Sequence, residues 1–191
     1  MERVANRIID FIFEVDEKKL DYEVCRFGIL MILEVVINTM IALLISLKIG
    51  MFIYGVVFLL IFSFLRAFAG GIHLQKFWCC TLLSSIIFSL ALLIVKYVNI
   101  SFYIPVIISL IISIIMILIG PVDNINRKIS EIERKHFRKR LISTIIILLS
   151  ISGICILFGY NRMYMLIFTT MSISALTQIC GKIKNIYISQ F

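Results

Sequence analysis

The chain has 191 residues, of which 61% are hydrophobic and 16% are charged, and its formal net charge is +8 at pH 7. Soluble domains are closer to half apolar, and the apolar residues here form long runs, so the composition excludes an ordinary soluble domain and indicates several membrane spans. The basic excess does not indicate nucleic-acid binding, because the aromatic residues lie in the apolar runs and are not interleaved with basic ones.

The first segment, residues 1–24, alternates apolar with charged side chains. This pattern predicts an amphipathic helix that lies in the membrane interface, with a soluble cap helix as the alternative interpretation. The early charges and the lack of a small-residue cleavage site argue against a cleaved signal peptide. We therefore expect one membrane-embedded domain over 1–191, in which this helix precedes the spans.

Six apolar runs follow, and each is close to the roughly twenty residues that cross a bilayer as a helix. They cover 26–47, 50–65, 77–96, 102–120, 141–159 and 163–180. Tight connections near residues 48, 99 and 161 predict helical hairpins. The sequence thus predicts an all-α integral membrane protein with about six transmembrane helices over 26–180 and a cytoplasmic tail at 181–191.

The basic residues predict the orientation of these spans. With the N-terminus inside, sixteen of the nineteen Lys and Arg residues fall in inner segments, and only Lys48, Lys96 and Arg162 fall in outer loops. Because Lys and Arg concentrate in cytoplasmic loops, both termini are predicted to be cytoplasmic and the location to be the cell membrane. The basic inner face would suit an anionic lipid or an acidic peptide.

The stretch RAFAGGIHLQKFWCC, residues 66–80, gathers groups capable of chemistry in the predicted inner loop between the second and third spans. The imidazole of His73 can take the proton of the Cys80 thiol, which makes a nucleophile that works at neutral pH. On one straight helix the two residues would stand about 10 Å apart along the axis, so His73 must lie off the helix of Cys80. Gly70 and Gly71 permit the backbone turn that this requires.

Other polar residues could support this pair. Arg66 and Lys76 provide positive charge and hydrogen-bond donors for a carbonyl oxygen as it becomes an oxyanion. Glu34, four residues before Asn38 in the first span, could orient His73 as the third member of a triad, or could make a hydrogen bond that only packs helices together.

Two further observations do not predict additional chemistry. Ser84 and Ser85 in the third span are read as helix-packing residues. Two histidines in the whole chain and no carboxylate in residues 66–80 make a zinc site hard to build, so we expect no metal and no cofactor.

The same stretch resembles the signature of the accessory gene regulator B (AgrB) family, the membrane cysteine endopeptidases of bacterial quorum sensing. The family pattern has an arginine, two small residues, a histidine, and a cysteine seven residues after the histidine; these are Arg66, Gly70, Gly71, His73 and Cys80. The polar stretch GPVDNINRKISEIERKHFRKR also resembles the family's inner loop. Because Cys79 precedes Cys80, the choice of Cys80 as nucleophile depends on spacing.

The resemblance implies a substrate and a reaction. Family members cut an AgrD-like propeptide, which has an amphipathic N-terminal helix and an acidic C-terminal part, through a thioester on the catalytic cysteine. A cysteine or serine of the peptide then attacks the thioester and closes a thiolactone or lactone ring. The implied partners are this propeptide and the lipid bilayer, without nucleic acid, and a homodimer is a candidate assembly.

Two other functions stay open on the residues alone. A small transporter or peptide-export component would use the spans as a path, although spans two to six hold almost no charge and a polar path would normally show some. A membrane scaffold without chemistry is the third candidate. The substitution Cys80→Ala separates these from an acyl-transfer enzyme, because only the enzyme needs the thiol.

Overall fold

The computed structural model describes residues 19–71, 77–98, 100–101, 103–122 and 130–188, which form helices joined by short segments. The helices are α2 (Lys19–Ile49), α3 (Phe52–Ala69), α4 (Phe77–Tyr97), α5 (Tyr103–Ile119), α6 (Glu131–Leu157) and α7 (Asn161–Ile188). Five of them are long and apolar enough to cross a membrane, and α5 is a shorter apolar helix. The predicted all-α membrane architecture is confirmed.

Four helix boundaries differ from the predicted spans by four residues or more. Helix α2 begins at Lys19 and not at residue 26. Helix α3 continues to Ala69, so Arg66 lies in its last turn and not in a loop. Helix α6 begins at Glu131, ten residues before the predicted span, because Ser130 forms a capping box with Glu133. Helix α7 continues through most of the expected tail, to Ile188.

The predicted interfacial helix falls largely outside the described residues. Residues 1–18 are not among them, and residues 19–24 are the beginning of α2. The amphipathic interfacial helix therefore stays a prediction.

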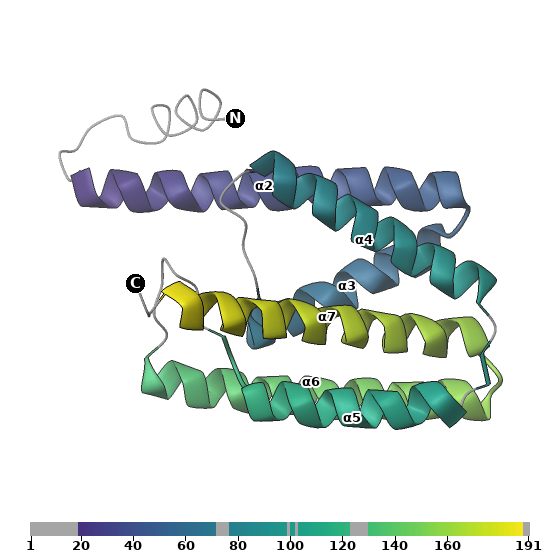
Figure 1. Cartoon of the computed structure of the whole chain (residues 1–191). Coiled ribbons are helices and arrows are strands. Elements are labelled where there is room, and N and C mark those ends of the chain that lie inside the picture. The colour runs from purple at the N-terminus through teal and green to yellow at the C-terminus, as the bar shows by residue number, and fades with distance from the viewer. Residues whose placement is uncertain (1–18, 72–76, 99, 102, 123–129, 189–191) are drawn as a thin grey trace.

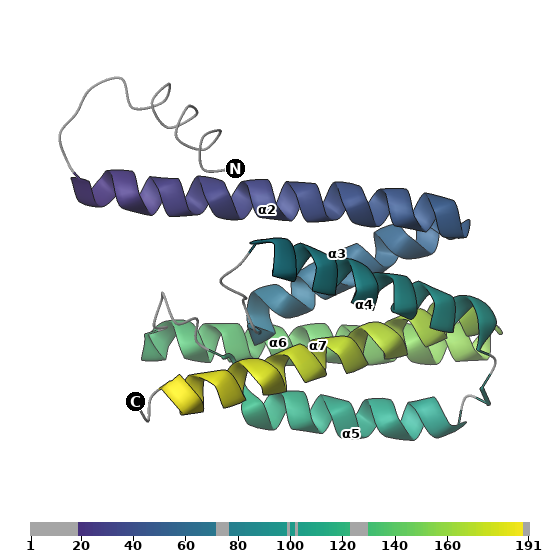
Figure 2. The ribbon, with the colours of Figure 1, turned by 45° about the horizontal axis from the view of Figure 1, so that its top comes forward.

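The helices pack around α7, which contacts α3, α4, α5 and α6. Helix α2 lies along one side of the bundle against α3 and α4, and α5 lies on the opposite side (Figures 1 and 2). The short α2–α3 and α6–α7 connections are at the same end of the bundle (Figure 1). The opposite end, where α6 begins and α3 and α7 end, is called the basic end here because it carries Arg66, Arg134, Lys135, Arg138, Lys139, Arg140, Lys182 and Lys184.

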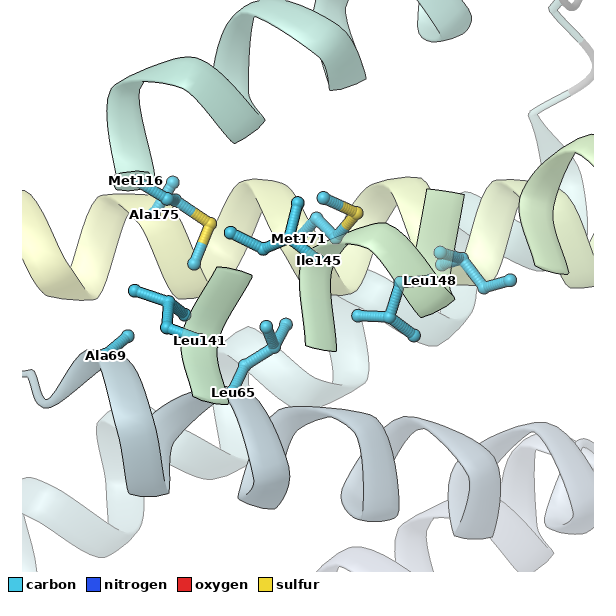
Figure 3. Packing of buried hydrophobic residues seen from close by; sticks show 9 residues of the cluster. Leu65, Ala69, Met116, Leu141, Ile145, Leu148, Met171 and Ala175 are labelled. Carbon is cyan, nitrogen blue, oxygen red and sulfur yellow. The ribbon is translucent and has the colours of Figure 1, made fainter. Parts of the chain in front are cut away.

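Two clusters of buried apolar side chains hold the bundle together, and α3 and α7 contribute to both. One cluster joins α3, α5, α6 and α7; Leu65, Leu141 and Met171 are among its fully buried members (Figure 3). The other joins α2, α3, α4 and α7 and contains Phe58 and Phe88, whose ring centroids are 5.2 Å apart. Because α3 is packed on two sides, the residues on its remaining faces are held in place.

The end of α3 is joined to the segment after α5. The backbone N–H of Val122 donates to the carbonyl oxygen of Ala69 at 3.0 Å. Gly70 has φ 73° and ψ −160°, a conformation that is essentially restricted to glycine. A Cβ at this position would also collide with the Val122 carbonyl oxygen. Gln178 of α7 holds the same segment after α5, because its Nε2 donates to the carbonyl oxygen of Gly120 at 2.7 Å.

We predict that Gly70→Ala lowers the free energy of unfolding by about 1–3 kcal/mol, because the alanine must be strained or the Val122 segment must move. Gly153→Ala in α6 is the matched control: a Cβ there meets no atom within 4 Å, and alanine favours a helix over glycine. Thermal unfolding of both variants in the same detergent measures the difference. Equal unfolding midpoints for the two variants would contradict the tight contact at Gly70.

Candidate active site

A cavity of about 470 Å³ lies between α2, α3 and α4, bordered by the two glycines that end α3 and by Val122. Its polar lining consists of Glu34, Asn38, Thr39, Ser63, Arg66, Cys80, Ser84 and Ser85. A smaller adjoining cavity shares Arg66 and Cys80 and is bordered by Ile173 and Thr177 of α7. Helices that are far apart in the sequence therefore converge on the same two side chains.

The cavity is built by the helical repeat. Residues four apart lie on one face of a helix, so each of three helices presents a stripe to the cavity. The stripes are Glu34, Asn38 and Ala42 on α2; Phe58, Phe62 and Arg66 on α3; and Cys80, Ser84 and Phe88 on α4. Helix α3 runs opposite to α2 and α4 (Figure 1). The ionisable residues of the three stripes therefore lie toward the basic end, and the Phe58 and Phe88 rings lie farther from it.

Cys80 is at the centre of the polar part. Its side chain hydrogen-bonds with Glu34 and Ser84 and interacts electrostatically with Arg66. Arg66 and Glu34 in turn attract each other. The structure thus brings together Glu34, Arg66 and Cys80 from three different helices. Cys79, in contrast, is exposed and does not line the cavity, so the two adjacent thiols have different surroundings.

The Arg66 guanidinium is held against neighbouring groups. It lies 5.9 Å from the centroid of the Phe62 ring, one helical turn earlier on α3. It also lies close to Gly71, where an added Cβ would be 3.6 Å from Nη1 and 3.5 Å from Thr177 Oγ1, both ordinary contact distances. Of the two glycines, therefore, Gly70 is the one whose conformation and surroundings require glycine.

Glu34 has two neighbours among the described residues, because its carboxylate contacts the Cys80 thiol and attracts Arg66. An additional role in orienting His73 stays a prediction. His73 and Lys76 lie in residues 72–76, outside the described residues. The His73–Cys80 pairing therefore stays a prediction.

Sequence reasoning gave too little weight to two residues of the cavity. Asn38 lines it, and the Asn38 Oδ1 atom is buried without a hydrogen-bond partner in the described part of the chain. An unsatisfied buried oxygen costs free energy, so it is available to a ligand in the cavity. Ser84 contacts Cys80, whereas Ser85 donates to the Thr81 carbonyl oxygen at 2.8 Å as a packing residue would. The four-residue spacing of Asn38 from Glu34 was the signal available.

Comparison with known proteins identifies a family for this arrangement. A family model described as accessory gene regulator B matches residues 2–179, which include every residue of the cavity. Comparisons with curated proteins and with solved structures give no match. The match covers nearly the whole chain, and the chain belongs to the accessory gene regulator B family.

Proposed function

We propose that this protein cleaves an AgrD-like propeptide by acyl transfer to Cys80 and promotes cyclisation of the peptide that is bound as a thioester. The family takes part in processing a quorum-sensing propeptide, which supports the substrate class. The observation that carries the chemistry is the meeting of Cys80, Glu34 and Arg66 in one cavity of an otherwise apolar bundle. Ionisable groups are costly among membrane-spanning helices and usually mark a functional site.

In the first step, the imidazole of His73 takes the proton of Cys80, and the thiolate attacks the carbonyl carbon of the scissile peptide bond. The carbonyl oxygen becomes negative and is stabilised by the Arg66 guanidinium, which already interacts with the Cys80 side chain. When the carbon–nitrogen bond breaks, the imidazolium returns its proton to the leaving amine. The N-terminal part of the propeptide is then held as a thioester on Cys80.

In the second step, a thiol or hydroxyl of the bound peptide attacks the thioester carbonyl, and the bond to Cys80 breaks. His73 takes the proton of the attacking group and returns it to the Cys80 sulfur, which leaves as a thiolate, and the peptide closes into a thiolactone or lactone. The inner part of the cavity is lined by the aromatic rings of Phe58, Phe62 and Phe88, which limits the water available to compete with ring closure. A thioester retains enough acyl-transfer potential for this exchange.

We propose Glu34 as a positioning residue for both partners of the reaction. Its carboxylate hydrogen-bonds with the Cys80 side chain and attracts Arg66, so one group orients the nucleophile and the charge that faces the oxyanion. Without it, the thiol loses a partner and the guanidinium loses its counter-charge. Small errors in the placement of reacting groups are sufficient to slow an enzyme strongly.

We further propose that the basic end faces the cytoplasm. Its cluster of Lys and Arg residues favours that side of a membrane. It would also attract the acidic part of a propeptide toward the cavity, whose polar part lies near this end.

The first prediction concerns the nucleophile. Cys80→Ala and His73→Ala should each abolish cleavage of the cognate propeptide, because the thiolate or its base is lost, whereas Cys79→Ala should keep substantial activity. Mass spectrometry of propeptide incubated with the protein in lipid vesicles measures the products. Normal cleavage by Cys80→Ala together with loss of activity in Cys79→Ala would assign the reaction to the other thiol.

The same nucleophile can be identified by trapping the thioester. A propeptide whose ring-closing cysteine or serine is changed to alanine can still acylate Cys80 but cannot release it. An adduct that survives denaturant and is removed by hydroxylamine should then accumulate on the Cys79→Ala protein, with about one C-terminal fragment released per active enzyme. Rapid multiple-turnover release of a linear peptide without an adduct would contradict the cyclase mechanism.

The second prediction concerns Glu34 and Arg66. Glu34→Gln should lower the cleavage rate by about 10²-fold, because the shape is kept while the charge that orients Arg66 is removed. If the two residues act together, the Glu34→Gln/Arg66→Gln variant should lose little more than the worse single variant, since coupled residues are non-additive.

Lys48 provides a control for this comparison of single and double variants, because it lies at the end of α2 that is far from the basic end. The effects of Glu34→Gln and Lys48→Gln on the cleavage rate should be additive. The alkylation rate of Cys80 in a Cys79→Ser background gives a readout independent of substrate. Wild-type rates of both alkylation and cleavage in Glu34→Gln would exclude a positioning role.

The third prediction concerns orientation. A single thiol placed at Glu131, the first residue of α6, should be protected from a membrane-impermeant reagent in intact cells. A thiol placed at exposed Tyr160, between α6 and α7, should be labelled under the same conditions. The reverse pattern would put the candidate active site on the outer face.

A further inference from the structure

A second and larger cavity, of about 870 Å³, lies on another face of α3, between α3, α6 and α7. In the part of the chain that the structure describes, this groove shares no lining residue with the candidate active site. Most of its length is apolar, and Leu60, Phe64, Ile147 and Ile151 form part of its walls. These four side chains are also exposed at the surface of the bundle, so the groove is open along its side.

The polar part of the groove is concentrated at the basic end. Lys139, Arg140 and Ser143 line it there, and among the described residues no Asp or Glu belongs to its lining. The Arg140 side chain is held in place: its Nε donates to His136 Nε2 at 3.0 Å, and its guanidinium lies 6.0 Å from the centroid of the Phe68 ring. The other guanidinium nitrogens are geometrically suited to a phosphate, which arginine binds with two parallel hydrogen bonds.

We propose that this groove binds one anionic phospholipid, whose phosphate contacts Lys139 and Arg140 and whose acyl chains lie between α3 and α6. Basic pockets at the ends of membrane-spanning helices are suited to anionic headgroups. From Arg140 to Ile151 the groove follows α6 for about 16 Å at 1.5 Å per residue, which is roughly the depth of one leaflet. The site thus matches both parts of such a lipid, the charged head and the apolar chains.

The open side of the groove argues against the two other occupants. An amphipathic peptide helix would turn its polar face outward between exposed apolar side chains such as Leu60 and Ile147, where the surroundings are lipid. A second copy of the chain, inserted in the same orientation, would bring its own Lys139 and Arg140 to the same level and add like charges. A phospholipid has neither disadvantage.

The test measures lipid retained by the purified full-length protein in detergent, by native mass spectrometry, after addition of phosphatidylglycerol or phosphatidylcholine. We expect at least a tenfold preference for phosphatidylglycerol. Lys139→Gln/Arg140→Gln should remove that preference. Lys135→Gln/Arg138→Gln, which makes the same charge change on α6 with exposed residues outside the groove, should keep it.

A second pair of variants tests the apolar part and does not depend on charge. Ile147→Trp should fill the groove and lower phosphatidylglycerol retention at least tenfold, whereas Ile146→Trp should not; the two isoleucines are similarly exposed, at 55% and 57%, but only Ile147 lines the groove. Thermal unfolding midpoints identify any variant that fails to fold. Retention that is equal within each pair would overturn the proposal, as would displacement of the lipid by inorganic phosphate alone or cross-linking of two copies through position 147.

Discussion

The structure of the candidate site depends on one electrostatic constraint: a carboxylate and a guanidinium set among apolar helices have to compensate each other. Glu34 comes from α2 and Arg66 from α3, and the two side chains attract each other between these helices. An uncompensated charge in such surroundings would cost several kcal/mol, which is more than a typical packing contact contributes. Cys80 lies between these charges because α4 packs against both α2 and the central helix α7.

Helix α3 determines where the Arg66 side chain lies, because different faces of this helix pack against different neighbours. Leu65 and Ala69 are buried in the cluster shared with α5, α6 and α7, while Phe62 and Arg66 line the candidate active site. A third face, with Leu60 and Phe64, borders the groove beside α6. A rotation of α3 by one residue position would therefore disturb a core and two cavities together, so the orientation of the Arg66 side chain is strongly determined.

Much of the fold could be predicted from the sequence, because the length of an apolar run that forms a spanning helix follows from the thickness of the bilayer. The end of α3 could not, since it depends on Gly70 and on its contact with Val122, some fifty residues later. Glu34 and Arg66 lie equally far from Gly50, on either side of a tight turn, so an antiparallel hairpin places them opposite each other. This proximity could be predicted from the sequence spacing. The contact of either residue with Cys80 could not be predicted, because it depends on how tertiary packing places α4.

The hydrogen bond from Val122 to Ala69 has a consequence for the shape of the candidate active site. Val122 lines that cavity, and its backbone is held by the end of α3. This border of the cavity is therefore fixed by main-chain atoms, which do not depend on the side chain at position 122. A larger or smaller side chain there would resize the cavity and leave the helices that carry Glu34, Arg66 and Cys80 in place. Relatives could in this way accept peptides of different size with the same reacting groups.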